Sequence, residues 1–199
     1  MAAYWHVDGL EIYAYDEDRP VKYASGPLDR LHPVKRGLGA KILIVSRQRL
    51  MHLRKRYPPA PKEKLAKAVA IEIKELFPLA NPGFYCRVFR AISNYVEMDI
   101  WAWETDLYER ISKVFPFNHV VPEDVLFSTE EPEASVYPCG KMIHMIAHYK
   151  EGYLDSACVP LMGFDRGQLE RFLLGIDQIG HELKEIKINT ALQQFPFVN

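Results

Sequence analysis

The fold is indicated first by residues 41–45, KILIV, which form a short and continuous apolar run. Such a run is typical of a central strand that is buried on both faces. Residues 50–54, LMHLR, follow closely, and we expect them to pair beside that strand. The prolines at 58, 59 and 61 then end the extended region, because proline cannot donate to a β ladder.

Downstream of these prolines, from Lys62, the apolar residues recur with the period of a helix. Pro78 and Pro82 predict where this helix ends. One side of it should pack against a core, and the charged side should face solvent. The predicted core positions are Leu65, Val69, Ile73 and Leu76.

Two further strands are predicted at residues 84–89 and 95–103, with a bend at Ser93 and Asn94. The second strand alternates clearly, so its two faces differ. We expect one face to meet the core and the other to carry acids and indoles. The core face has Val96, Met98, Ile100 and Ala102, and the outer face has Glu97, Asp99, Trp101 and Trp103.

Upstream, residues 4–7 and 10–15 are rich in aromatic and branched side chains and flank the dipeptide Asp8-Gly9. Asp-Gly between two such runs is a strong hairpin signal, so an N-terminal β hairpin is predicted. Residues 21–23 are expected to return as a third strand.

The first lobe ends with one more helix, and a second, smaller unit then repeats the pattern of strands, helix and strand. Thr105 is predicted to cap a short helix that includes residues 107–114, and residues 120–126 leave the first lobe. After the acidic stretch 129–133, strands are expected at 141–149 and 153–159. A helix that begins with a capping pair follows, and a last strand comes after this helix. The pair is Asp165 and Gln168, the helix has Leu169, Phe172, Leu173, Ile176 and Ile179 on one face, and the strand is 185–188.

This order of elements predicts an α/β fold with mixed sheets covered by helices, rather than a helical bundle or a β sandwich. We expect two lobes, residues 1–128 with an inserted segment and a smaller lobe at 129–199.

The charge balance of the 199 residues narrows the possible partners. With 25 basic and 26 acidic side chains the net charge is −1, which argues against a surface that binds polyanions over the whole protein. The three cysteines have no CxxC spacing, which favours a reducing compartment. The N-terminus lacks the basic and apolar regions of a secretory signal, and no stretch is apolar enough for a membrane-spanning helix. We therefore expect a cytoplasmic chain.

Asp8 and Gly9 also stand where an actin-like or sugar-kinase-like ATPase places a phosphate-gripping turn and an acid for the metal. The same pair is an ordinary hairpin signal, and the sequence has no Walker-type loop and no GxGxxG motif. At the first hairpin of the second lobe the sequence reads PCGK at 138–141, without an acid. We treat Asp8 and Gly9 as a vestigial phosphate turn and expect no bound cofactor.

A metal site or a nucleophile is not predicted either. Cys139, His144, His148 and Cys158 could be imagined as zinc ligands, but their spacing fits no standard zinc pattern. Their surroundings are those of a half-buried strand, and nothing places a thiolate beside a base.

Two features remain as candidate surfaces. Between residues 47 and 67 there are eight basic side chains and one acid. A solvated face is the default interpretation, but such a density also suits anionic lipid headgroups, and it suits them better than nucleic acid. Trp101 and Trp103, on the outer face of their strand, are candidates for protein contact, although they could lie under the following lobe. The membrane-facing candidates are Arg47, Arg49, Arg54, Lys55, Arg56 and Lys62.

Taken together, several of these stretches resemble a known family. They are the ILIV strand at 42–45, the RQR at 47–49, the PPAP at 58–61, and the helix containing IEIKELFP at 71–78. The aromatic strand at 98–102 and the VPE at 121–123 continue the pattern. The sequence resembles the cytoplasmic domain of GspL, a platform protein of type II secretion, and the related PilM proteins of type IV pilus assembly.

This resemblance implies an actin-like, ribonuclease H-like fold of two lobes. It also implies a non-enzymatic scaffold at the cytoplasmic face of a bacterial inner membrane, which binds the assembly ATPase through that motor's N-terminal domain and contacts other platform proteins. GspL continues into a membrane-spanning helix and a periplasmic domain, so we expect a cytoplasmic piece or a separately encoded homologue. The alternative is an ATP-binding PilM-like protein or another actin-fold ATPase or kinase relative. The missing acid of the second lobe favours the GspL-like interpretation.

Overall fold

The computed structural model describes residues 1–16, 19–34, 41–126, 133–149, 152–175 and 187–189. The chain divides into two compact units, Met1–Pro122 and Glu123–Asn199. The lobe boundary expected at 128/129, and the acidic stretch 129–133 apart from Glu133, lie outside the described residues.

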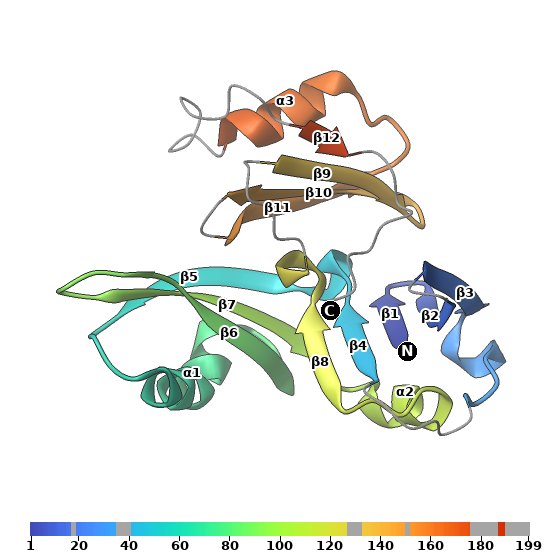
Figure 1. Ribbon diagram of the computed structural model, residues 1–199, viewed down its shortest axis with the longest axis horizontal. Coiled ribbons are helices and arrows are strands. Elements are labelled where there is room, and N and C mark those ends of the chain that lie inside the picture. The colour runs from blue at the N-terminus through green and yellow to red at the C-terminus, as the bar shows by residue number, and fades with distance from the viewer. Residues whose placement is uncertain (17–18, 35–40, 127–132, 150–151, 176–186, 190–199) are drawn as a thin grey trace. The chain divides into compact units, whose positions relative to one another are not determined.

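The centre of unit 1 is a five-stranded mixed sheet in which three antiparallel strands continue into two parallel ones (Figure 1). The expectation that residues 41–45 form a central buried strand is confirmed, because β4 lies between β1 and β8 and Leu43 and Val45 are fully buried. The strands in spatial order are β3 (Arg19–Gly26), β2 (Gly9–Asp16), β1 (Ala2–His6), β4 (Ile42–Val45) and β8 (His119–Pro122).

The N-terminal hairpin is also confirmed, since His6 pairs with Gly9 across the turn at Val7 and Asp8. Gly9 has a φ of +150°, and a Cβ built there would lie 2.1 Å from the carbonyl oxygen of Gly26 on β3. Only glycine therefore fits where β2 and β3 approach each other.

A second element group of unit 1 follows the short helix η2 (Arg47–Arg49). It is a three-stranded antiparallel sheet in the order β5 (Met51–Tyr57), β7 (Val96–Glu104) and β6 (Pro82–Ala91), covered on one face by helix α1 (Lys62–Leu76). The expected helix core is confirmed, because Leu65, Val69 and Ile73 pack against Met98 and Ile100 of β7.

The expectation that residues 50–54 pair beside 41–45 is wrong, because β5 pairs with β7 instead. The reason lies at Ser46, whose backbone N–H donates to the carbonyl of Trp5 and whose hydroxyl accepts from the N–H of Gln48. This cap starts η2 directly after β4 and turns the chain out of the central sheet.

Helix α2 (Tyr108–Val114) returns the chain to the central sheet, with Ile111 and Val114 buried. Thr105 does not cap it, contrary to expectation: the Thr105 hydroxyl donates to the carbonyl of Asn81, and the cap residue is Leu107. The threonine is used to tie the end of β7 to the start of β6.

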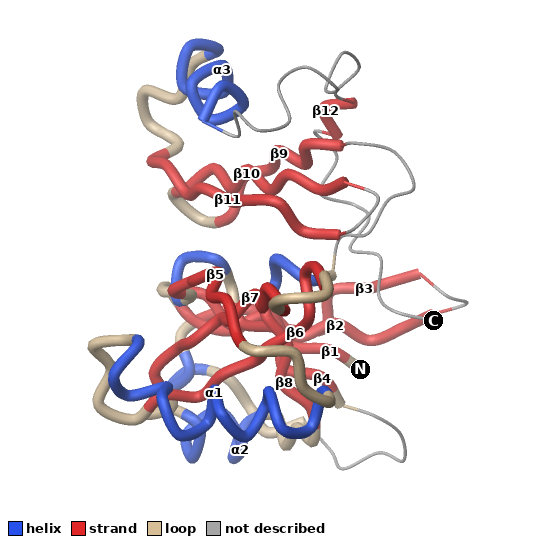
Figure 2. Tube along the Cα trace, turned by 90° about the vertical axis from the view of Figure 1, so that its left-hand side faces the viewer, coloured by secondary structure: helices blue, strands red, loops and turns tan. Residues whose placement is uncertain are grey.

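The strands of unit 2 lie side by side in Figure 2. They repeat the strand order of the central sheet of unit 1, with three antiparallel strands and then one parallel strand. Unit 2 begins with the short helix η3 (Glu123–Val125). The Asp165–Gln168 capping pair is confirmed by reciprocal hydrogen bonds of 2.8 and 3.2 Å, whereas Ile176 and Ile179 lie outside the described residues. The elements are β11 (Gly152–Pro160), β10 (Met142–Tyr149), β9 (Glu133–Cys139), β12 (Lys187–Asn189) and the helix α3 (Arg166–Gly175).

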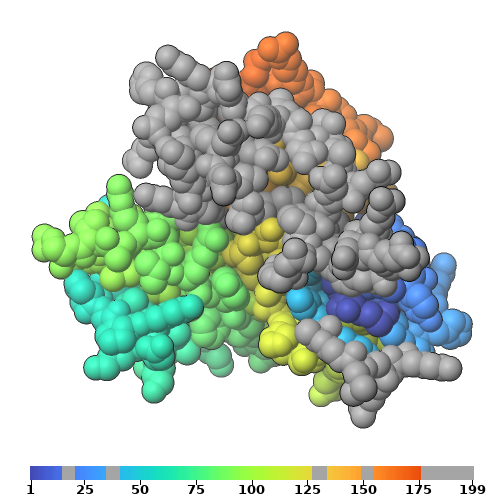
Figure 3. Space-filling view, in the orientation of Figure 1, coloured from blue at the N-terminus to red at the C-terminus, as the bar shows by residue number. Residues whose placement is uncertain are grey.

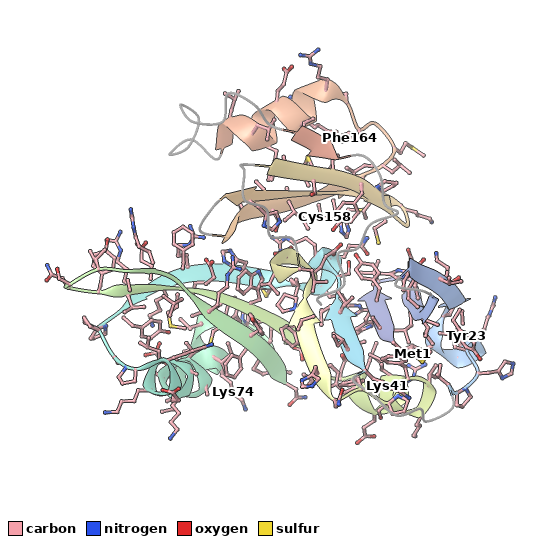
Figure 4. The ribbon with its side chains drawn as sticks, viewed as in Figure 1. Met1, Tyr23, Lys41, Lys74, Cys158 and Phe164 are labelled. Atoms are coloured by element: carbon pink, nitrogen blue, oxygen red, sulfur yellow. The ribbon has the colours of Figure 1, made fainter. Side chains whose placement is uncertain are left out.

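The two faces of the unit 2 sheet are different in character. Val136, Ile143 and Met145 form an apolar cluster with Phe164 on the face that α3 covers, and Cys158 belongs to the opposite face (Figure 4). His144 lies directly between Tyr137 and Cys158 in the strand register, so these three side chains share that opposite face.

Candidate functional site

The first hairpin of each unit is where an actin-like nucleotide site would hold its phosphates and metal. Asp8 is exposed, and its backbone N–H donates to Nδ1 of His6 at 3.3 Å. The matching β9–β10 hairpin turns at Gly140, with φ +58°, and Lys141. Asp8 and Gly9 therefore lie at the first hairpin, and the described turn of unit 2 has no acidic side chain. That the first turn is a vestigial phosphate turn stays a prediction.

The face of the β5–β7–β6 sheet that α1 does not cover carries a group of charged side chains. Strand register sets them in rows: Arg54, Asp99 and Arg87 form one, and Arg56, Glu97 and Arg90 the next. We call this surface, defined by Arg54, Arg56, Arg87 and Arg90 with the acids Asp99 and Glu97, the arginine face. It is polar because alternate residues of each strand point away from the α1 core.

Asp99 lies at the centre of the arginine face and is fully buried. Its Oδ1 accepts from Nε of Arg54 at 2.8 Å and lies 3.1 Å from Nε2 of His52. Nε of Arg87 lies 3.6 Å from Oδ2. Burial alone would raise the pKa of Asp99, but the hydrogen bonds from His52 and Arg54 outweigh it and hold the pKa below its usual value.

Three guanidinium groups of this face lie over aromatic rings, and the guanidinium carbon of Arg87 is 5.3 Å from the centre of the Trp101 ring. The guanidinium carbon of Arg54 is 3.5 Å from the centre of the Phe89 ring, and that of Arg56 is 4.5 Å from the centre of the Tyr95 ring. Nε of Arg56 also donates to Oε1 of Glu97 at 2.8 Å, while 67% of the Arg56 side chain remains exposed. Each guanidinium is thus fixed from below by a ring and a carboxylate.

Trp101 and Trp103 lie on the predicted face of β7, but the expectation that they are exposed for protein contact is wrong. They are 0% and 2% exposed. Trp101 packs between His52 and Tyr85, at ring distances of 5.0 and 6.0 Å, and the indole N–H of Trp103 donates to the hydroxyl of Tyr108. Neighbouring large side chains cover both indoles, which the alternation of a single strand does not reveal.

The six basic residues that were expected to form one membrane-facing patch are distributed over different surroundings. Arg54 and Arg56 belong to the arginine face, whereas Lys55 points to the other side of β5 and pairs with Glu72 at 2.5 Å. Arg49 lies 4.3 Å over the Trp5 ring. Arg47 donates to the carbonyl of Leu50, and Lys62 is exposed at the start of α1. Contact of these residues with lipid stays a prediction.

Unit 2 contains a buried polar cluster that the sequence pattern did not predict, and the cluster begins at Glu123 and Asp124, both fully buried. The hydroxyl of Tyr137 donates to Glu123, and Nδ1 of His144 lies 3.2 Å from Oε2 of the same carboxylate. The hydroxyl of Ser156 donates to Asp124 at 3.0 Å. The available signal was a pair of acids directly after the apolar strand that ends at Pro122.

His144 is therefore an ion-pair partner of a carboxylate rather than a member of a Cys/His zinc set. Burial alone would lower its pKa, but the charge of Glu123 and the hydrogen bonds that the imidazole makes to Glu123 and Cys158 raise the pKa to about 10. Within the part of the chain that the structure describes, no group of three or more His, Cys, Asp or Glu side chains is arranged to hold a metal ion.

Among the described segments, no helix combines the length and the apolar character needed to cross a membrane.

Comparison with known proteins gives similarity at the level of structure. No family model and no curated protein matches the sequence. The structure is similar to the cytoplasmic domain of EpsL, an inner membrane component of the type II secretion system of Vibrio cholerae. The TM-score is 0.59 and the identity 10%, over 97% of this chain and 85% of that chain.

Two other solved structures are also similar. One is a chain of the PilM–PilN type IV pilus biogenesis complex, with a TM-score of 0.54 and 10% identity over 92% of this chain and 65% of that one. The other is a Bacteroides thetaiotaomicron protein with an actin-like ATPase fold and unknown function, with a TM-score of 0.50 and 10% identity over 97% and 82%. The similarity to GspL-type and PilM-type proteins expected from the sequence is confirmed at the level of fold, and the chain has an actin-like fold.

Proposed function

We propose that this chain is a non-enzymatic cytoplasmic scaffold of a bacterial type II secretion or type IV pilus platform, and that it recruits the assembly ATPase. The observation that carries the proposal is the similarity to the EpsL cytoplasmic domain, which extends over 97% of this chain and 85% of that domain. A PilM–PilN complex as a second neighbour supports contact with other platform proteins.

The hairpins of the two units support the non-enzymatic part of the proposal. An actin-like ATPase needs acidic and backbone groups at both first hairpins to hold the metal and the phosphates. Here the unit 2 turn consists of Gly140 and Lys141 and follows Cys139, so an acid is missing from it. A positive Lys141 does not replace a carboxylate as a magnesium ligand, because Mg²⁺ prefers oxygen donors.

The recruitment proposal is tested by immobilising the full chain and passing a lysate of its source organism over it, with bound proteins identified by mass spectrometry. We expect a secretion or pilus assembly ATPase to be retained. If that ATPase is shown to be in the lysate and stays in the flow-through, the recruitment role is contradicted and the similarity reduces to a shared fold.

The location at the inner face of the membrane is tested separately, with purified chain and vesicles that contain anionic lipid. We expect co-sedimentation that salt reverses, because exposed charges are screened at high ionic strength. Equal binding to neutral and anionic vesicles would contradict a contact made by basic side chains.

A further inference from the structure

The arginine face carries more positive charge at its surface than the neutral composition of the chain suggests. Its four arginines face two acids, and these acids lie underneath: Asp99 is 0% and Glu97 9% exposed. The arginine side chains are nearer to solvent, at 30% for Arg54, 24% for Arg87 and 67% for Arg56. The carboxylates hold the guanidiniums in place while the outward surface stays cationic.

The cations are most exposed at the end of the sheet where β6 and β7 are joined. Arg90 is exposed there, and Ile92 in the connecting bend is 42% exposed. In the space-filling view this green β6–β7 end of unit 1 projects at the left edge (Figure 3). A partner can therefore approach this end of the sheet.

The spacing of the arginines is regular because a strand sets it. Arg54 and Arg56 are two residues apart on β5, so their side chains leave the same face about 6.6 Å apart. Their ring and carboxylate contacts limit the rotamers of both guanidiniums, so little side-chain entropy is lost when a carboxylate binds. A second extended chain that carries acids at alternate positions has the same spacing.

We propose that the arginine face is a docking surface for an acidic, extended segment of a partner protein, whose alternate carboxylates pair with Arg54 and Arg56, while Arg90 on β6 adds positive charge beside them. The inference rests on the proposed scaffold function, because a recruiting scaffold needs such a surface. Guanidinium groups bind carboxylates through two parallel hydrogen bonds, which gives geometric specificity as well as charge attraction.

The details of this face favour a peptide over a nucleic acid or a bilayer. The Phe89 and Tyr95 rings are already covered by guanidiniums, so they are not open platforms for bases. Glu97 and Asp99 lie directly behind the arginines and repel a densely negative surface. A segment with a few separated carboxylates instead places each carboxylate against one arginine.

The test is an NMR titration of the ¹⁵N-labelled full chain with a synthetic peptide that has aspartates at every second position. The control probe has asparagine in their place. We expect shifts of the amides of residues 54–56 and 87–90 that salt reverses, and no such shifts with the asparagine peptide. Shifts spread evenly over other cationic surfaces, or equal shifts with both peptides, would overturn the proposal.

The matched variants remove two positive charges each from different surfaces. Arg56→Gln with Arg90→Gln leaves the Arg54–Asp99 pair intact, and Lys64→Gln with Lys67→Gln removes exposed charges from α1. We expect at least tenfold weaker peptide binding in the arginine double variant and less than a twofold change in the lysine double variant, with both variants shown to be folded by their amide spectra. Equal losses in both, or no loss in the arginine variant, would overturn the proposal.

Two further experiments distinguish the possible sources of negative charge and show whether this inference or the proposed function fails. If inorganic phosphate or anionic vesicles bind through Arg56 and Arg90 more tightly than the peptide does, the peptide assignment is overturned. If wild-type protein retains the ATPase and the arginine variant retains it equally, this inference fails while the proposed function stands. If the peptide binds as expected but the ATPase does not, the proposed function fails instead.

Discussion

His144 and Glu123 form a buried ion pair that makes the stability of unit 2 depend on pH. Folding raises the pKa of His144 from its ordinary 6.5 to about 10, so the folded state holds this proton more tightly than the unfolded state. The stabilisation is fully present below about pH 6.5 and is lost as the pH rises through 10.

We predict that the His144→Gln variant is less stable than wild type by a few kcal/mol at pH 6, because the substitution leaves Glu123 buried without its cation. The difference should shrink between pH 6.5 and 10. Urea unfolding of both proteins at each pH measures it, and contributions from groups common to both cancel. A difference that is constant over this range would show that the histidine is not protonated in the folded state.

In the arginine face, Asp99 is the buried carboxylate that pairs with basic side chains, as Glu123 does in unit 2. Asp99→Asn removes the charge that Arg54 and His52 share, and we expect a loss of about 2 kcal/mol or more in the free energy of unfolding. The control is Glu109→Gln on the exposed surface of α2, which should change stability by less than about 0.5 kcal/mol. Equal effects of the two substitutions, in thermal or urea unfolding, would contradict a structural role of this carboxylate.

For single residues, the sequence predicted the strand face on which a side chain lies better than it predicted which other side chains contact it. The alternation at 96–103 correctly assigned Asp99 and Trp101 to the polar face of β7. It could not reveal that Trp101 is buried, because His52 and Tyr85 come from two other strands. The role of Glu123 was hidden for the same reason: its partners Tyr137 and His144 are 14 and 21 residues away.

Helix α1 illustrates how strongly one face of an element can contribute to stability. Leu65 is 3% exposed and packs into the apolar cluster beneath the β5–β7–β6 sheet, whereas Ile71 on the same helix is 82% exposed. Leu65→Ala should cost about 2–5 kcal/mol, because it removes buried methyl groups and leaves a cavity. Ile71→Ala should cost less than about 0.5 kcal/mol. Chemical denaturation that gave similar losses for both would contradict the observed orientation of the helix.

The first hairpin gives a second prediction for an element. Gly9→Ala places a methyl group 2.1 Å from the carbonyl oxygen of Gly26 at a φ of +150°, so we expect a loss of at least about 2 kcal/mol. Gly175→Ala, where nothing lies within 4 Å of the new methyl group, should leave the melting temperature unchanged or slightly higher. A tolerated Gly9→Ala would show that β2 and β3 do not approach as closely as described.

Elements with a strong local pattern were predicted well, and connections between them were not. The apolar run at 42–45 and the helical period from 62 to 76 led to β4 and α1. The pairing of β5 with β7 rather than β4 depends on the capped turn at Ser46 and on partner residues that come 39 to 51 positions after those of β5 in the chain. No local pattern contains that information.

At the scale of the whole molecule, the repeated strand order of the two units identifies the fold more firmly than any motif does. Unit 1 and unit 2 both have three antiparallel strands followed by a parallel strand, as expected for two related lobes. With 10% identity to each of the three solved structures compared, this architecture is what the chain shares with them.

The absence of an acid from the second hairpin leads to a prediction about nucleotide. A ligand that binds the folded state stabilises it, so Mg-ATP at millimolar concentration should leave the melting temperature unchanged if there is no functional site. A rise of several degrees that Asp8→Ala abolishes would instead support the ATP-binding, PilM-like alternative.

The most direct test of the central claim is calorimetric titration of the purified chain with the purified N-terminal domain of the assembly ATPase from the same organism. The scaffold account predicts saturable binding that does not require nucleotide and that leaves the ATPase domain folded. Absence of binding at the highest soluble concentrations, with both proteins shown to be folded, would contradict it.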